Sequence, residues 1–171
     1  VTPTDSGSTL VRGGVGLFYD KIPLNVGSFE QYQSLLVTTF ATDGVTPDER
    51  VEFWRGVIRE KILPVDFRVD DRKMFSAGLA SATVGDLQVT DLHISAHVAE
   101  CGRTALAHDH ENMLIFNFMH AGRAVSAQDG RRIALAPGTG MFCTSARPFT
   151  LEFPEQAHLT VLRIPRAALE R

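Results

Sequence analysis

The sequence predicts a mainly β protein, a barrel or sandwich of short strands flanked by one amphipathic helix. From Val65 onward, short segments recur in which apolar and polar residues alternate, as they do in half-buried strands. Turn-forming pairs separate these segments, among them Gly85-Asp86, Asp129-Gly130 and Pro137-Gly138. Only the segment after Gly44 has apolar residues at clear helical spacing. This pattern favours antiparallel sheets over the alternating strands and helices of a parallel sheet.

The composition is that of an ordinary folded domain. A chain of 171 residues has room for one domain with a core, plus an extension. Hydrophobic residues make up 44% and charged residues 22%, so most of the chain is expected to fold. The formal net charge of -3 supplies no positive field for phosphate groups. We therefore expect that this chain alone binds no nucleic acid.

Cysteine usage and hydropathy predict the compartment. Cys101 and Cys143 are the only cysteines, and they form neither a metal-binding pair nor a disulfide framework. We expect two buried free thiols in a reducing environment. The sequence has no apolar run of about eighteen residues and no signal peptide pattern. These features predict a cytoplasmic protein without membrane contact.

The N-terminal part differs from the rest of the chain. Residues 1–43 are rich in Gly, Ser, Thr and Asn, and Leu10 to Asp20 can form one strand. A single strand buries too little apolar surface to offset the cost of ordering it. We therefore predict a loosely ordered extension over residues 1–45 and a folded domain over residues 46–171.

A helix is predicted at the start of the folded domain. Thr46 is the expected N-cap, Pro47 suits the first helical position, and Glu49 completes a capping box. Pro64 ends the helix. The apolar face carries Val51, Phe53, Trp54, Val57, Ile58 and Ile62.

Strands are predicted over most of the remaining chain. The first one alternates Val65, Phe67 and Val69 with charged residues. Asp129-Gly130 is the strongest hairpin signal, because both central residues of a type I′ turn need positive φ. The other predicted strands span residues 75–84, 87–95, 113–120, 133–135, 141–144, 149–153 and 159–164.

Several short segments occur in a characteristic order: Glu49 to Arg55, Leu63 to Asp70, Met113 to Arg123, Gln128 to Arg131, Leu135 to Gly138, Thr144 to Phe153 and Leu162 to Pro165. Over residues 46–171 they resemble the N-terminal cupin-like domain of AraC-type transcription regulators. The resemblance implies a cupin-like barrel that serves as an effector-sensing or dimerisation domain. It implies a small-molecule effector as partner, and a second copy of the chain as a further candidate. The sequence ends before the helix-turn-helix units of such regulators.

A second resemblance concerns the extension. Leu10 to Leu24 is similar to a barrel segment of TonB-dependent outer-membrane receptors. A membrane barrel needs a closed ring of eight or more strands, so one such strand cannot insert alone. A fragment of an outer-membrane receptor is nevertheless a second alternative for the function of the chain.

The pattern His108-Asp109-His110 is the most chemically suggestive one, because alternate strand residues share a face. It is similar to the histidine pair with which cupin oxygenases and isomerases hold a metal ion. Such a site needs further ligands on the same face, whereas Glu111 points away and no histidine occurs shortly after Gly138, over residues 139–143. We therefore predict surface or pocket-lining histidines, no metal or other cofactor, and no enzyme activity. A metal-dependent enzyme that uses His108 and His110 is the alternative.

The predicted strand over residues 113–120 offers the pocket. Leu114, Phe116 and Phe118 share one face, which we expect to turn into the barrel, where aromatic side chains line a cavity or fill the core. Arg147 either anchors a carboxylate of the effector or braces a turn. The predicted ligand-binding residues are His93, His108, His110, Leu114, Phe116, Phe118 and Arg147.

Overall fold

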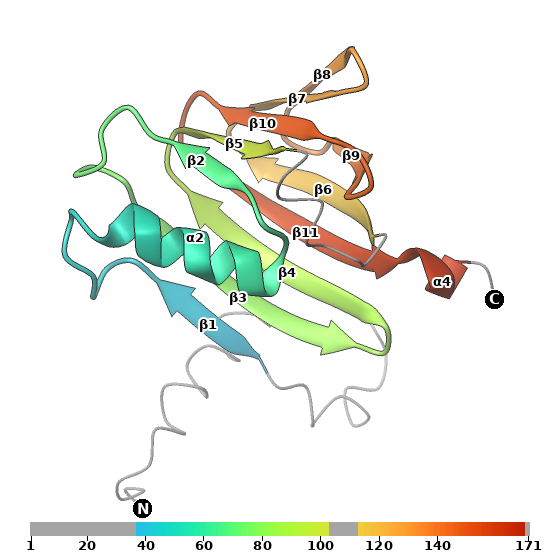
Figure 1. The fold of residues 1–171 in the computed structure, drawn as a ribbon, viewed down its shortest axis with the longest axis horizontal. Helices are drawn as coiled ribbons and strands as arrows, with labels where there is room; N and C mark the ends of the chain where they lie inside the picture. Colours follow the sequence, from blue (N-terminus) through green and yellow to red (C-terminus); the bar gives the residue numbers. More distant parts are fainter. Residues whose placement is uncertain (1–36, 103–112, 170–171) are drawn as a thin grey trace, which may run out of the picture.

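The computed structural model describes residues 37–102 and 113–169, which form two antiparallel sheets packed face to face (Figure 1). The six-stranded sheet has the order β1-β3-β4-β11-β6-β9, and the five-stranded sheet has the order β2-β5-β10-β7-β8. Two helices accompany the sheets. The elements are β1 (Thr38–Ala41), α2 (Arg50–Lys61), β2 (Asp66–Arg68), β3 (Ala77–Val84), β4 (Leu87–Ile94), β5 (His97–Cys101), β6 (Met113–Ala121), β7 (Ala124–Gln128), β8 (Arg131–Leu135), β9 (Gly140–Thr144), β10 (Phe149–Phe153), β11 (Ala157–Pro165) and α4 (Arg166–Leu169).

The core lies between the two sheets. On β4, Leu92 and Ile94 are buried, while the residue between them is only partly so. The same alternation on β11 buries Leu159 and Val161, which are 1% and 3% exposed. These side chains meet residues from β2, β5 and β10 across one interior space. The predicted mainly β architecture is therefore confirmed, and on β11 the period-2 pattern indicates which side of the strand faces inward.

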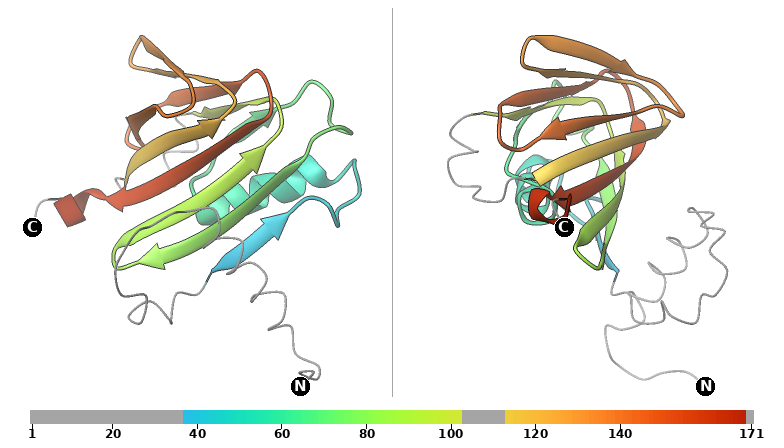
Figure 2. Two further views of the ribbon diagram at one scale, coloured as in Figure 1. Left: turned by 180° about the vertical axis from the view of Figure 1, so that it is seen from behind. Right: turned by 90° about the vertical axis from the view of Figure 1, so that its right-hand side faces the viewer.

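Helix α2 covers the part of the six-stranded sheet that the five-stranded sheet does not cover (Figures 1 and 2). There the helix lies beside β1 and β2. Trp54 is fully buried, and Val51 and Val57 lie in the same core cluster. The predicted helix is thus present, but its predicted start at Thr46 is wrong. The helix begins at Arg50, because the capping-box side chains bond each other, Thr46 Oγ1 to Glu49 Oε2 at 2.6 Å, within a preceding turn.

The predicted boundary of the extension is too late in the sequence. Strand β1 pairs with β3 along its whole length, from Thr38↔Ser81 to Ala41↔Gly78. Thr42 is fully buried, and its hydroxyl both accepts from the Ala77 N–H at 3.0 Å and donates to the Ala77 carbonyl. The sheet therefore includes residues 38–41. The predicted strand at Leu10 to Asp20 and the receptor-like segment lie outside the described residues.

Turn chemistry fixes two further strand junctions. Asp129 and Gly130 have φ of 54° and 75°, which confirms the predicted type I′ turn between β7 and β8. Gly122, between β6 and β7, has φ of 77°, and a Cβ there would collide with the carbonyl oxygen of Gln156. Only glycine fits that position.

Among the described residues, no helix is long and apolar enough to cross a bilayer.

Candidate functional site

The space between the sheets is nearly filled. A cavity of about 50 Å³ remains at its centre, bordered by Leu92, Ile115, Leu159 and other apolar side chains. Sites for small organic molecules measure about 300 to 1,000 Å³, so the cavity is too small to hold one as it stands. Its two polar neighbours are His97 from β5 and Asn117 from β6, which are 5% and 2% exposed.

His97 is the most perturbed titratable group at the cavity. Its ring stacks on Phe153 with centroids 4.7 Å apart and meets Phe67 at 5.4 Å. Burial lowers the pKa of His97 to about 4, against the opposing effect of its hydrogen bond to the Ser95 carbonyl. Nδ1 lies 2.9 Å from that carbonyl oxygen, which can only accept, so Nδ1 carries the proton. Nε2 therefore presents a lone pair.

An open cleft adjoins His97 on the other side. It measures about 510 Å³ and lies at the rim of the barrel, between β2, β5 and β10. His97 and Phe153 border both the cleft and the interior cavity. Charged residues of both signs line the outer part of the cleft, and they are Arg68, Asp70, Asp71 and Glu152. The cleft thus combines an aromatic floor with a polar rim.

The predicted pocket face of β6 points the other way, so this expectation is wrong. Ile115 and Asn117 border the interior cavity, whereas Leu114, Phe116 and Phe118 lie on the outer face of the six-stranded sheet. Both faces of β6 are apolar, and the sequence of that strand alone does not distinguish them. The row of outer aromatic side chains instead continues onto β9, where the ring centroid of Phe142 is 4.6 Å from that of Phe116. Phe142 is 55% exposed.

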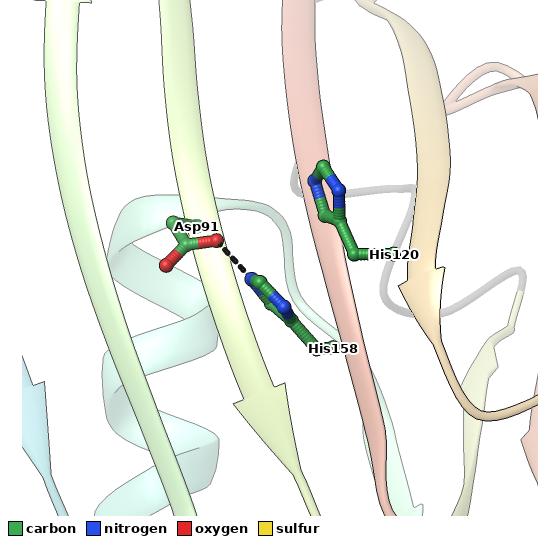
Figure 3. A group of neighbouring side chains, drawn as sticks. All are labelled: Asp91, His120 and His158. Atoms are coloured by element: carbon green, nitrogen blue, oxygen red, sulfur yellow. Dashed lines mark hydrogen bonds and ion pairs between the residues drawn. The ribbon is translucent and has the colours of Figure 1, made fainter. Parts of the chain in front are cut away.

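Three histidines and a carboxylate gather on that same outer face, and Figure 3 shows two of the histidines, His120 and His158, with Asp91. His93 on β4 pairs in register with His158 on β11, and their rings stack with centroids 3.9 Å apart. His158 Nε2 lies 2.6 Å from Asp91 Oδ1, and the His120 ring of β6 is 4.6 Å from that of His158. The pKa of His120 is lowered, first by burial and then by the neighbouring His158, against the opposing charge of Asp91. The predicted ligand residue His93 belongs to this cluster and lies outside the rim cleft.

Arg147 and Leu114 border a third hollow, a groove of about 570 Å³ next to α4. The Arg147 guanidinium pairs with Asp129 at 2.6 Å, so its charge already has a carboxylate partner.

Burial raises the pKa of Cys143 to about 12, so this thiol is protonated at neutral pH. Cys101 and Cys143 are both buried thiols that form no disulfide, as predicted.

His108 and His110 lie outside the described residues, and their predicted role stays a prediction. His97 and Asp91 are not among the residues that the sequence predicted for a site. His97 alternates with Ala99 and Cys101, which are small and apolar, and this alternation is the signal that places its ring inside the barrel. Asp91 gave no such signal, because its partners come from strands far away in the sequence.

The two facing sheets, with helix α2 at their open end and the cleft at the rim, define a cupin-like β-barrel. The chain belongs to the family of AraC-binding-like domains, whose sequence model matches residues 54–171. The predicted AraC-type resemblance and the cupin-like fold are thereby confirmed.

Among solved structures, the fold is similar to that of the AraC-like transcriptional activator CuxR. The TM-score is 0.66 at 22% sequence identity, over 77% of this chain and 48% of that chain. A cupin domain of an XRE family transcriptional regulator from Enterobacter cloacae gives a TM-score of 0.39 at 16% identity, over 47% of this chain and 84% of that one.

A curated relative is an uncharacterized protein in the nit 5′ region of Bacillus sp. (strain OxB-1). It is 23% identical over 132 residues, which are 77% of this chain and 51% of that protein. The chain therefore spans about half the length of the curated relative that it matches.

Proposed function

We propose that this domain senses a small-molecule effector for a transcription regulator, and that the effector binds in the rim cleft against His97. The main support for this proposal is that His97 and Phe153 border both the cleft and the interior cavity. A ligand on this aromatic floor can thereby alter the packing between the two sheets. The volume of about 510 Å³ is within the range of small-molecule sites.

The lining of the cleft defines the chemistry of the proposed effector. The His97 and Phe153 rings favour an aromatic or apolar part, and Nε2 of His97 can accept one hydrogen bond from it. Arg68 lies at the rim and pairs with Glu100 at 2.5 Å, while Glu152 borders the same cleft. We therefore expect a small amphipathic molecule with a donor group near its apolar part. The proposed role is binding, and no reaction is assigned to the site.

A thermal-shift screen tests the proposal. The probes are small aromatic and heteroaromatic acids, amides and alcohols, and each molecule that raises the melting temperature is then titrated by calorimetry. His97→Gln removes the imidazole ring and moves the acceptor from Nε2 to an amide oxygen, while the amide nitrogen can still donate to the Ser95 carbonyl. For a cleft ligand, we expect this substitution to weaken binding by about tenfold, which is about the effect of one well-placed hydrogen bond.

The matched control is Arg123→Ala, because Arg123 is exposed and neither it nor its ion-pair partner Glu155 lines the cleft. This substitution should leave the affinity unchanged. Binding that survives His97→Gln but fails on Arg147→Ala would contradict the proposal, since it would move the ligand to the groove beside α4. A screen without any ligand of these classes would also count against it.

Dimerisation is a second candidate function, favoured by exposed apolar side chains on one side of the molecule. Phe142 and Leu169 are 55% and 58% exposed and border the same groove as Leu114. Apolar surface of this kind is typical of interaction sites when it is contiguous. We expect a self-associating chain to become monomeric in Phe142→Ser with Leu169→Ser, as measured by sedimentation velocity. A dimer that persists in this variant uses another surface.

A further inference from the structure

The outer face of the six-stranded sheet brings three potential metal ligands together from three adjacent strands. Asp91 comes from β4, His158 from β11 and His120 from β6, as Figure 3 shows. One ligand atom of each lies within 4.8 Å of those of the other two. Among residues 37–102 and 113–169, this is the one group of three such side chains that lies so close together.

A β-bulge explains why His120 joins the group. On the partner strand, His158 pairs with Ala121 and Leu159 pairs with Met119, so His120 is the extra residue of β6 at this point. A bulge bends its strand and re-aims the side chain at the irregularity. The His120 ring lies 4.6 Å from the His158 ring, and its Nε2 is 2.7 Å from the Thr160 hydroxyl.

The charge at the cluster favours a cation. Asp91 is only 7% exposed, and its ion-pair partners among the described residues are the imidazoles of His158 at 2.6 Å and His93 at 3.6 Å. A buried carboxylate needs a compensating positive charge, which a neutral imidazole does not supply. No lysine or arginine in the described part of the chain pairs with Asp91.

The ligand set matches a borderline transition metal. Two imidazole nitrogens and one carboxylate oxygen are the three-ligand arrangement that Zn²⁺ accepts, and they leave at least one position open. Hard cations such as Mg²⁺ and Ca²⁺ prefer all-oxygen sites. We propose that Asp91, His120 and His158 bind a divalent transition-metal ion such as Zn²⁺ on the outer face of the six-stranded sheet. His93 stacks on His158 and holds the ring in place.

Metal binding requires a small rearrangement at Asp91. In the metal-free cluster, His158 Nε2 donates its proton to Asp91 Oδ1. Ligation through Nε2 requires this nitrogen to give up its proton, and the ion takes the place of the proton between the two side chains. The site lies on the opposite face of the sheet from Leu92 and Leu159, so it is separate from the rim cleft. A failure of metal binding therefore leaves the proposed effector function untouched.

Titration of the untagged, metal-free full chain with Co²⁺ tests the proposal. We expect one equivalent to bind, with visible absorption bands from coordinated Co²⁺ and their loss on addition of Zn²⁺. His120→Ala should weaken binding at least about tenfold, because even a residue that only orients a ligand contributes this much. His120 is exposed, so its substitution should leave the melting temperature of the metal-free chain unchanged. Asp91→Asn provides a second, isosteric variant with the same expected loss.

The control is the double variant His108→Ala with His110→Ala, which removes the other histidine pair of the sequence. It should bind Co²⁺ with unchanged affinity. Binding that is lost in the double variant but kept in His120→Ala would overturn the proposal. The absence of stoichiometric Co²⁺ and Zn²⁺ binding to the unmodified chain would overturn it as well.

Discussion

The two faces of the six-stranded sheet are built from alternate residues of the same strands, yet they have different chemistry. On the inner face, Ile94, Ile115 and Leu159 are at most 2% exposed and belong to one continuous core. On the outer face, Phe116, Phe118 and the histidines form a row of half-buried or exposed rings that ends at Asp91. The inner face therefore carries the stability of the fold, and the outer face carries the proposed metal site.

Truncation of Trp54 should produce the largest loss of stability. Trp54 is fully buried in the core. Replacement of a buried tryptophan by alanine costs about 3 to 5 kcal/mol of folding free energy. Phe53, the preceding residue of α2, is 37% exposed and provides the control. Urea unfolding should show a loss of less than about 1 kcal/mol for Phe53→Ala. Equal losses in the two variants would mean that α2 does not pack by the face described.

Neighbouring positions of the six-stranded sheet test its two faces directly. Ile115→Ala on the inner face of β6 should cost about 2 to 5 kcal/mol, because it leaves a cavity in a filled core. Phe142→Ala on the outer face of β9 removes a larger side chain, but 55% of that residue is exposed. Its expected cost is less than about 1 kcal/mol. A larger loss for Phe142→Ala would reverse the assignment of the faces.

The sequence reveals the architecture better than the orientation of β6. The alternating pattern and the Asp129-Gly130 turn were sufficient for the mainly β fold, because both depend on local backbone geometry. In β6, apolar residues occupy both faces, so the inward side is chosen by the register with β11 rather than by the strand itself. The short strands β5 and β7 escaped prediction, since His97–Cys101 and Ala124–Gln128 mix apolar with polar residues over only five positions.

The candidate sites depend even more on contacts between distant segments. Asp91 and His158 are 67 positions apart, and no pattern near either residue indicates the other. The extra residue of the bulge at His120 becomes visible only when β6 is paired with β11. For His97, by contrast, the alternation with Ala99 and Cys101 gave a usable local signal.

The inner face also contains a group that should make the stability depend on pH. His97 has a pKa of about 4 in the folded barrel, where burial disfavours its charged form, against 6.5 when unperturbed. Between these values the unfolded chain binds a proton at this residue and the folded chain does not. The stability is therefore complete above about pH 6.5 and falls as the pH decreases toward 4. The full loss from this residue is about 3 kcal/mol.

The comparison of wild type with His97→Gln isolates this contribution, because the other titrating groups are common to both chains. The variant lacks the titrating ring, so its stability should fall less on acidification. Urea unfolding near pH 7.5 and near pH 4.5 should show that the wild type loses about 2 to 3 kcal/mol more than the variant. Parallel losses in the two chains would mean that His97 titrates as an exposed histidine does. The ring would then lie outside the core, and the aromatic floor proposed for the rim cleft would not exist.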